Sequence, residues 1–335
     1  MSQVTLTTQR AIPSTADSLH VRDRLTSAVA SIGITLVAVI AIGLLWVGPR
    51  FLSASNMTIV GSFVAVPLLV GTCAGFALLA GVVDLSIGSM VGFGGAVFGL
   101  LVAAGWSPWT AAGASLALCL MCGTINAMAI VVFGASPIAA TLGMLTALAG
   151  LNRVLLAPRG QVAALVTDLL SFTGRPVLSL PLLFLLALVV VAIATVVVTR
   201  TRVGRHVQAA GGDELAATRA GISVPRVRFV ALLLSAAGAG LGGIFYVGQL
   251  GSASNSLGTG LEFQVYAALM IGGYSILRGG VGNPAGGAVG LLVVAGVANI
   301  LDVKAISPYY VNIIVGLLLL AAVLIDRLRG GDAYE

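Results

Sequence analysis

Few side chains in this sequence could take part in chemistry, because only 8% of its 335 residues are charged. The two histidines, His20 and His206, are far apart in the sequence and lie outside the apolar runs. Cys119 and Cys122 form a C-x-x-C inside an apolar run, where thiols pack like other small apolar side chains. We therefore expect no catalytic residue, metal site or cofactor in this chain.

The sequence also lacks the residues that would bind ATP or a coupling ion. A P-loop needs a lysine that reaches the phosphates, and the single lysine, Lys304, does not follow a glycine-rich loop. An ion-coupled carrier needs ionisable groups buried near the middle of its spans, whereas Asp84 and Glu262 stand near the ends of apolar runs. If the chain takes part in an energy-driven process, the energy is therefore expected to come from another chain.

One polar stretch, the loop 200–228, interrupts a long series of apolar runs. Its arginines include Arg202, Arg205, Arg219, Arg226 and Arg228. Asp213 can cap a short helix through Glu214, Ala217 and Arg219, and Gly221 can end it. Acidic residues in the first turn and an arginine in the last suit the helix dipole. We expect this helix to be the attachment point for a partner protein.

The composition, with 59% hydrophobic residues, is that of an integral membrane protein. The apolar runs are continuous and do not alternate, which predicts an all-α polytopic bundle rather than strands. About ten spans of roughly 20 residues fit the length. We place them near 26–47, 57–80, 87–104, 109–133, 137–156, 178–199, 229–248, 262–277, 285–301 and 308–325. The third, fifth, eighth and ninth are shorter or richer in glycine, so eight or nine spans with re-entrant pieces are the alternative.

The distribution of positive charge predicts the orientation, because Lys and Arg are retained on the cytoplasmic side. With both termini cytosolic, the residues on the other side are only Arg50, Arg153, Arg159, Arg175 and Lys304, out of 17. The chain divides into a polar, disordered cytosolic tail (1–25), a transmembrane domain (26–328) and a short cytosolic tail (329–335). No basic-aromatic pattern for nucleic acid is present.

Five segments resemble, in order, the ribose/xylose/arabinose-type permeases of bacterial ABC importers. The segment 210–222 (AGGDELAATRAGI) is similar to the cytoplasmic coupling segment of that family. The others are 81–89 (GVVDLSIGS), 136–143 (SPIAATLG), 258–262 (GTGLE) and 271–273 (IGG) with 279–282 (GGVG). The resemblance covers about residues 30–328. The chain departs from the family pattern at Val82-Val83, where Gly-Ile is more usual, and at Tyr274, where a smaller residue is usual.

The resemblance implies a permease subunit, not an enzyme, in the bacterial inner membrane. It implies a dimer with a second permease copy or a paralogue, ABC ATPase subunits on the cytosolic side and a soluble periplasmic sugar-binding protein on the other. The expected cargo is a monosaccharide such as a pentose, moved by alternating access. The alternatives are branched-chain amino acids or nucleosides, or an ion-coupled secondary carrier.

Within this scheme the ATPase-coupling residues are Asp213, Glu214, Ala217, Arg219 and Gly221. The gate or hinge residues are Asp84, Ser86, Gly88, Gly279, Gly280 and Gly282. The purely structural interpretation of Asp84 is a helix N-cap, since an apolar run starts directly after it. Asn126 and Thr141 lie inside apolar runs and are expected to pair across helices.

The expected substrate pathway at the outer mouth consists of Gln249, Ser252, Ser254, Asn255 and Glu262, which offer hydrogen bonds to a hydroxylated solute. The alternative for Glu262 is a carboxylate favoured by a helix N-terminus. Glycines four residues apart, such as Gly88/Gly92 and Gly238/Gly242, predict close helix packing. Few polar and aromatic side chains line the spans, so selectivity is expected to lie with the binding protein.

Overall fold

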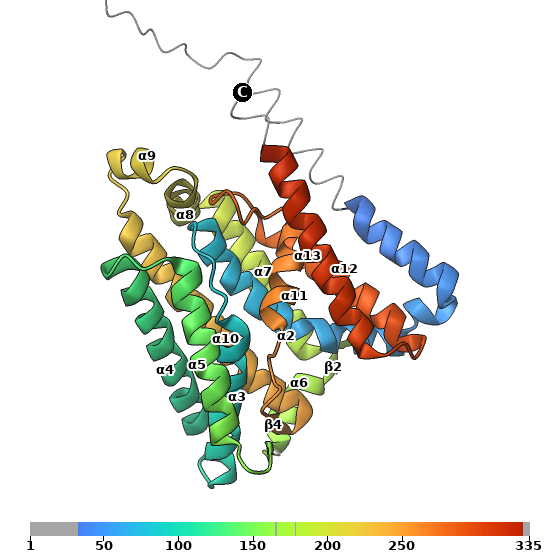
Figure 1. Ribbon diagram of the computed structural model, residues 1–335. Helices are drawn as coiled ribbons and strands as arrows, with labels where there is room; N and C mark the ends of the chain where they lie inside the picture. Colours follow the sequence, from blue (N-terminus) through green and yellow to red (C-terminus); the bar gives the residue numbers. More distant parts are fainter. Residues whose placement is uncertain (1–32, 165, 178, 331–335) are drawn as a thin grey trace, which may run out of the picture.

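The computed structural model describes residues 33–164, 166–177 and 179–330 and shows a bundle of helices (Figure 1). Its first part contains the helix Gly33–Trp46, the short η1 (Pro49–Leu52), α2 (Ala54–Leu79), α3 (Ile87–Ala103), α4 (Pro108–Ala127) with the π-turn η2 (Met128–Val132), and α5 (Pro137–Leu155). The predicted tail 1–25 lies outside the described residues.

The second part of the chain is equally helical. It contains α6 (Thr167–Gly174), α7 (Leu182–Arg200), α8 (Arg202–Gly212), α9 (Glu214–Arg219), α10 (Val224–Leu250), α11 (Leu261–Ile271), α12 (Pro284–Val303) and α13 (Pro308–Gly330). The all-α class predicted from the sequence is confirmed for the described residues. Helix α13 runs to Gly330, past the predicted end of the transmembrane domain at residue 328.

Six of the described helices are long and apolar enough to cross a membrane: α2, α4 with η2, α5, α7, α10 and α12. Four shorter apolar helices are Gly33–Trp46, α3, α11 and the segment Tyr309–Ala321 of α13. All of them fall at the predicted spans. Of the four spans expected to be short or glycine-rich, α3 and α11 are short, whereas α5 and α12 have full length. The number of crossings and the side of the termini stay predictions.

The centre of the bundle is formed by α2 and α10. Helix α10 packs on α2, α3 and α4, and α2 also packs on α7 and α12. Glycines allow the two central helices to approach closely: a Cβ atom added to Gly242 would lie 2.6 Å from the Val70 side chain, and one added to Gly238 would overlap Cys73. The packing role predicted for Gly238 and Gly242 is confirmed.

Helices α3 and α11 are too short to span a bilayer alone. Their 17 and 11 residues correspond to about 26 and 17 Å at 1.5 Å per residue, against about 30 Å of hydrocarbon. Each is preceded by non-helical backbone, residues 80–86 before α3 and residues 255–260 before α11. Such backbone is tolerated at membrane depth where protein surrounds it.

The polar stretch folds as two helices, α8 and α9, at one end of the bundle (Figure 1), which we call the α9 end. Sequence analysis predicted α9 but not α8. Helix α8 begins after Thr201, whose hydroxyl accepts a hydrogen bond from the Gly204 N–H at 3.3 Å. It is amphipathic, since Val207 and Ala210 are buried while Arg202, Arg205 and His206 are exposed.

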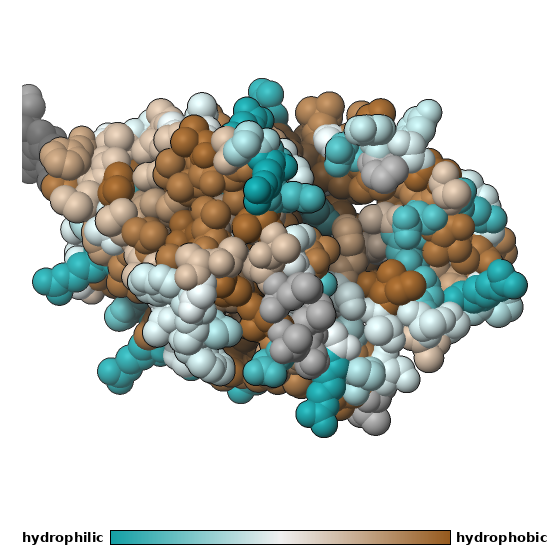
Figure 2. Space-filling view, turned by 90° about the horizontal axis from the view of Figure 1, so that it is seen from below, coloured by the Kyte–Doolittle hydropathy of each residue, from teal (hydrophilic) through white to brown (hydrophobic). Residues whose placement is uncertain are grey.

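Short strands occur in the connections, although the sequence predicted none in the apolar runs. β1 (Gln161–Ala163) pairs antiparallel with β4 (Ser252–Ser254), and β2 (Pro176–Val177) pairs with β3 (Leu180–Pro181). Strand β4 follows the far end of α10, opposite α8 and α9. Figure 2 views the molecule from this opposite end, where hydrophilic side chains are interspersed with a largely apolar surface.

Candidate functional site

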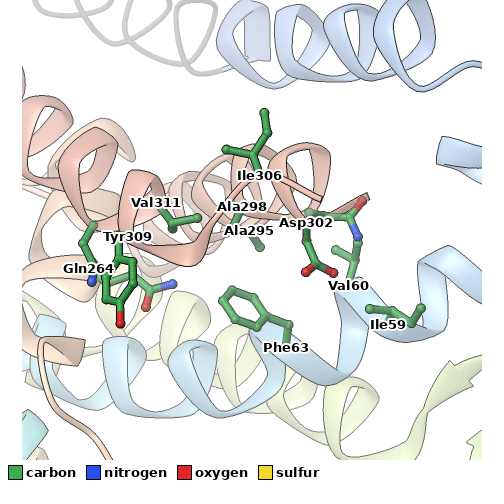
Figure 3. A pocket seen from close by; sticks show the side chains of 12 residues that line it. Ile59, Val60, Phe63, Gln264, Ala295, Ala298, Asp302, Ile306, Tyr309 and Val311 are labelled. Atoms are coloured by element: carbon green, nitrogen blue, oxygen red, sulfur yellow. The ribbon is translucent and has the colours of Figure 1, made fainter. Parts of the chain in front are cut away.

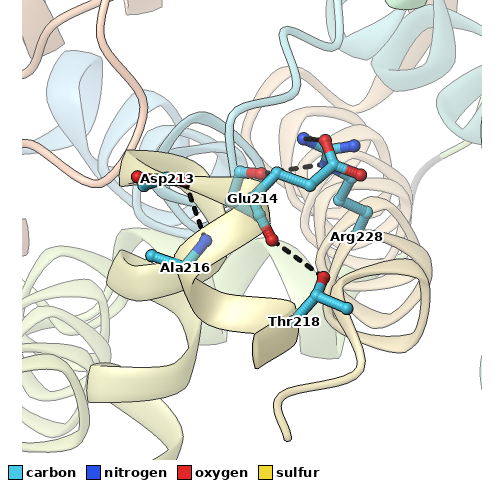
Figure 4. A network of polar contacts seen from close by, with 6 residues as sticks. Asp213, Glu214, Ala216, Thr218 and Arg228 are labelled. Carbon is cyan, nitrogen blue, oxygen red and sulfur yellow. Dashed lines mark hydrogen bonds and ion pairs between the residues drawn. The ribbon is translucent and has the colours of Figure 1, made fainter. Parts of the chain in front are cut away.

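The predicted coupling helix is present as α9, and Figure 4 shows the cap at its N-terminus. The Asp213 carboxylate accepts a hydrogen bond from the Ala216 N–H at 2.9 Å. After the last turn, Gly221 adopts φ = 80°, a left-handed conformation that favours glycine, and its N–H donates to the Thr218 carbonyl at 2.9 Å. The predicted N-cap and glycine stop are both confirmed, so this six-residue helix has well-defined ends.

One face of α9 is free in the described chain. Leu215 is 69% exposed, and Arg219 is exposed as well. On the other face, Ala217 is buried against Ala210 of α8 and Val224 of α10. Of the predicted coupling residues, Ala217 is therefore buried, Asp213 and Gly221 cap the helix, and Arg219 forms an exposed surface together with Leu215.

Arg228 at the start of α10 connects α9 to the bundle (Figure 4). Its Nη2 atom forms an ion pair with Glu214 Oε2 at 2.9 Å, and its Nε donates to the Ala80 carbonyl at 3.4 Å. Ala80 is the C-cap of α2 and begins the non-helical segment before α3. A displacement of α9 would thus act through a single side chain on the end of α2.

A second connection is made by glycine backbones. The Gly280 N–H donates to the Leu79 carbonyl of α2 at 2.9 Å. Gly211, near the end of α8, lies so close to both segments that an added Cβ would be 2.6 Å from the Gly280 nitrogen and 2.9 Å from the Gly81 nitrogen. We call this contact of Gly81, Gly211, Gly279 and Gly280 the glycine junction. It brings the predicted hinge residues Gly279 and Gly280 directly against the end of α8.

Gly282 and Tyr274 complete the turn between α11 and α12. Gly282 has φ = 145°, and an added Cβ would overlap the Tyr274 ring. The same ring faces Gly75 of α2, where an added Cβ would be 2.8 Å from the tyrosine hydroxyl oxygen. Tyr274, at the position where the family pattern has a smaller residue, is therefore accommodated by glycines on both sides.

Asp84 lies in the non-helical segment before α3 and is only 1% exposed. One carboxylate oxygen accepts hydrogen bonds from the Ser86 N–H (3.1 Å) and hydroxyl (2.6 Å), and the other accepts from the Ser235 hydroxyl of α10 at 2.8 Å. The Tyr266 hydroxyl of α11 donates to the Asp84 carbonyl at 2.9 Å. The Asn126 amide of α4 donates to the Ser86 hydroxyl oxygen at 3.0 Å. We call these residues the Asp84 cluster.

The prediction that Asp84 is a helix N-cap is wrong. Ser86 occupies the N-cap position of α3, and the Asp84 carboxylate instead closes a local turn onto the Ser86 N–H. Asn126 pairs with the N-cap residue Ser86 of α3, as expected, whereas the Thr141 hydroxyl bonds to the Pro137 carbonyl of its own helix at 2.8 Å and lies 3.4 Å from the Val83 carbonyl of the non-helical segment. Groups from α4, α5, α10 and α11 thus hold this one break in the chain.

Glu262 does not lie at the outer mouth, contrary to the sequence prediction. It is 5% exposed and faces Gly88 in the first turn of α3, where an added Cβ would overlap Glu262 Oε2. Gly258, with φ = 77°, also contacts Gly88 through the backbone. The first turns of α3 and α11 therefore meet inside the bundle, and Glu262 Oε2 has no hydrogen-bond partner in the described residues.

The other four predicted pathway residues belong to structural contacts with distant segments of the chain. The Gln249 amide donates to the Ser62 carbonyl of α2 at 3.1 Å. Ser252 and Ser254 belong to β4, and the Asn255 N–H donates to the Gly160 carbonyl at 2.9 Å. None of these four residues, nor Glu262, lines either of the two cavities described below.

A cavity of about 430 Å³ with a mixed apolar and polar lining lies instead between α2, α11, α12 and α13 (Figure 3). Its hydrogen-bonding side chains are Gln264, Asn299, Asp302, Tyr309 and Asn312, and Phe63 adds an aromatic face. Asp302 is the only charged residue in this lining. This cavity could not be predicted from the sequence, because its polar groups are spread over three separate segments, α11, α12 and α13.

Two asparagines fix one wall of this cavity. The Asn56 amide donates to Asn299 Oδ1 at 2.9 Å, and the Asn299 amide donates back to Asn56 Oδ1 at 2.9 Å. Both side chains are buried. The reciprocal pair joins the first turn of α2 to α12 and consumes most of the hydrogen-bonding capacity of both amides.

Sequence reasoning missed Arg228, Gly81, Gly211 and Tyr266 as members of these sites. Arg228 appeared only as one of several arginines of the polar loop, and the glycines as part of a motif. Tyr266 had the clearest signal, a hydroxyl inside an apolar run that must find a partner when buried. Its partner could not be derived from spacing, because Asp84 lies 182 positions away in the sequence.

Comparison with known proteins identifies the family. The protein family described as branched-chain amino acid transport system / permease component matches residues 56–323. The D-allose transport system permease protein of Escherichia coli K12 is 31% identical over 281 residues, which cover 83% of this chain and 85% of that protein.

Two further relatives from Escherichia coli align over still more of the chain. The autoinducer 2 import system permease protein of strain K12 / DH10B is 31% identical over 301 residues (88% of this chain, 87% of that protein). The ribose import permease protein of strain K12 is 30% identical over 298 residues (88% and 92%). No solved structure matches the chain. The family resemblance predicted from five motifs is confirmed: the chain belongs to this family of multi-pass transport permeases, which includes the ribose-type sugar permeases.

Proposed function

We propose that the chain is the membrane-spanning subunit of an ATP-driven importer in the bacterial inner membrane and that its cargo is a monosaccharide or a similar hydroxylated solute. The names of its relatives, for D-allose, autoinducer 2 and ribose, support this cargo class. The partners would be ABC ATPase subunits at the α9 end, a soluble binding protein at the opposite end, and a second permease copy or paralogue.

The observation that carries the proposal is the connection of α9 to the two non-helical segments. The exposed Leu215 and Arg219 offer a surface for a groove on the ATPase. Arg228 and the glycine junction then link α9 to Ala80, Gly81 and the 279–282 turn. When ATP binding closes the ATPase pair, α9 would move as a rigid unit and displace the ends of α2 and α11, which is a route to alternating access.

The cavity of Figure 3 supports a neutral, hydroxylated cargo rather than an amino acid. Its lining offers amides, a phenol and aromatic faces, which suit hydroxyl groups and sugar rings. A branched-chain amino acid carries a carboxylate, and no lining residue is a cation that could pair with it. We therefore place solute contact in this cavity and keep selectivity with the binding protein.

Reconstitution tests the proposal. Proteoliposomes that contain this chain, its ATPase and its binding protein should accumulate a labelled monosaccharide only when ATP is supplied on the side of the membrane that α9 faces. Arg228→Ala should lower uptake per ATP hydrolysed about tenfold, as expected for loss of a charge-assisted contact of roughly 1.4 kcal/mol. Thr218→Val is the matched control, because among the described residues that hydroxyl bonds only to the Glu214 carbonyl within α9, at 2.8 Å.

Three results would overturn the proposal. Uptake that survives without ATP but collapses with an uncoupler would indicate an ion-coupled carrier. Accumulation of leucine in preference to sugars would indicate the amino-acid alternative. Equal uptake per ATP in Arg228→Ala and wild type would remove the coupling route through α9.

A further inference from the structure

A second cavity, of about 550 Å³, lies on the side of the bundle near the α9 end. Helices α7 and α10 form its two side walls, α2 forms its back, and α8 closes it towards the α9 end. Both α7 and α10 pack on α2, which leaves a groove between them. This volume falls within the range of about 300–1,000 Å³ that is usual for small-molecule sites.

The interior of this groove offers almost no hydrogen bonds. Its walls are mainly valine, alanine, leucine, isoleucine and phenylalanine side chains. Thr72 is the exception on α2, but its hydroxyl donates to the Leu68 carbonyl of its own helix at 2.6 Å. A sugar or another polar solute would therefore lose its hydration here without compensation. An aliphatic chain fits such walls.

The polar groups of the groove stand together at one end. His206 of α8 and Arg226 of α10 line it there, and both are exposed. No acidic residue is among the lining residues, and neither side chain belongs to an ion pair in the described part of the chain. The groove thus combines a long apolar body with an uncompensated basic end, the charge pattern that complements an anionic amphiphile.

The groove is also open at its sides. Ile193 of α7 and Val230 of α10 are 59% and 63% exposed along its two edges. Both helices are candidate membrane spans, so the surface outside these edges is lipid-facing. The apolar surface is continuous from the groove to the surrounding bilayer, and an acyl chain could enter sideways without crossing water.

We propose that this groove binds an anionic phospholipid of the leaflet at the α9 end, with one acyl chain between α7 and α10 and the head-group phosphate at Arg226 and His206. Basic pockets between helices on the cytoplasmic side recognise anionic head groups in this way. Since α8 leads directly into α9, a lipid wedged between α8 and α10 would also hold the base of the coupling segment. Assignment to the cytoplasmic leaflet rests on the proposed orientation of α9.

Lipid retention by the purified full-length chain tests this inference without ATP or transport, so a negative result leaves the proposed function untouched. The chain is exchanged into mixed phosphatidylglycerol/phosphatidylcholine nanodiscs, extracted in mild detergent and weighed intact by native mass spectrometry. Wild type should retain one phosphatidylglycerol in preference to phosphatidylcholine. Arg226→Gln should reduce this preference about fivefold, because each cation near the surface contributes about 1 kcal/mol.

Three further variants separate the groove from general charge effects. Arg205→Gln removes an equal charge from α8 at a residue outside the cavity lining and should retain the lipid like wild type. Val230→Trp, at the exposed rim of the groove, should block the site of the acyl chain and lower lipid retention without disturbing the packed wall. Ala194→Trp, deeper in the groove, is the corresponding buried variant.

Several outcomes would overturn the proposal. Equal retention of the two lipids would show that the groove does not recognise an anionic head group. Equal effects of Arg226→Gln and Arg205→Gln would indicate diffuse electrostatic attraction. Displacement of the lipid by inorganic phosphate alone would point to a free-anion site. Unchanged retention in Val230→Trp would show that the acyl chain lies elsewhere. Loss of the lipid on assembly would show that the second copy or the ATPase covers the groove.

Discussion

Single residues in this molecule stabilise the places where the chain leaves the helical conformation inside the bundle. Asp84 is the clearest case, because its two carboxylate oxygens accept three hydrogen bonds from Ser86 and Ser235. Those bonds satisfy backbone and side-chain groups that an interrupted helix would otherwise leave unpaired. The sequence pointed to Asp84 as a helix N-cap or a gate residue, but it could not show that a partner of its carboxylate is Ser235 of a distant helix.

Substitution of Asp84 should therefore affect stability before it affects transport chemistry. Asp84→Ala should lower the free energy of unfolding by about 3 kcal/mol, because buried donors lose their acceptor. Asp84→Asn keeps one acceptor oxygen and should lose about half as much. Thermal unfolding in detergent measures both, with the exposed Asp302→Asn as a control that stays within about 0.5 kcal/mol of wild type. A wild-type melting curve for Asp84→Ala would contradict the role of the Asp84 cluster.

At the scale of elements, short helices were harder to predict than long ones. Helix α9 was predicted with its caps because Asp213 and Gly221 carry local signals. Helix α8 was missed because its two terminal glycines looked like a loop, although the buried positions Val207 and Ala210 follow a helical spacing. The glycine junction could not be predicted at all, since the contacts of Gly211 depend on where α2 and the 279–282 turn lie in space.

The glycine junction predicts a sharp difference between two adjacent residues. Gly211→Ala would place a Cβ against the backbones of α2 and Gly280, which cannot move aside like a side chain, so α8 must separate from both. Gly212→Ala meets nothing nearer than the Gly279 carbonyl at 4.0 Å. We expect Gly211→Ala to lose most ATP-coupled uptake in the reconstituted system, while Gly212→Ala keeps it. Similar uptake by the two variants, each checked for a monodisperse folded protein, would argue against the junction.

At the scale of the whole molecule, the sequence predicted the position of nearly every apolar helix but not the depth of its residues. Glu262 was placed at the outer mouth because it opens the eighth apolar run. Before it, however, residues 255–260 form consecutive turns instead of a helix, and Glu262 in the first turn of α11 is buried against Gly88 of α3. A helix that starts inside the bundle therefore carries its first residues to the interior, and no local signal shows this.

Accessibility labelling tests the orientation of the whole bundle. Leu215→Cys lies on the exposed face of α9, and Ser256→Cys lies in the exposed turn after β4. The native Cys73, Cys119 and Cys122 are buried and should give little background. In intact inner-membrane vesicles of known sidedness, an impermeant maleimide should reach Leu215→Cys only from the cytosol and Ser256→Cys only from the periplasm.

The same experiment tests the docking surface. Bound ATPase should protect Leu215→Cys from the reagent and leave Ser256→Cys reactive. Labelling of Leu215→Cys from the periplasm would reverse the proposed topology. Unchanged labelling in the presence of the ATPase would place its docking surface elsewhere on the chain.

The reciprocal amide pair between Asn56 and Asn299 constrains how the cavity of Figure 3 can change shape. If α2 slid by one turn along α12, both hydrogen bonds would break together and two buried amides would be left without partners. No intermediate position of the two helices would replace these bonds. These two helices should then travel as one block during the transport cycle. Widening and narrowing of the space beside them would consequently fall to α11 and α13, which form the opposite wall.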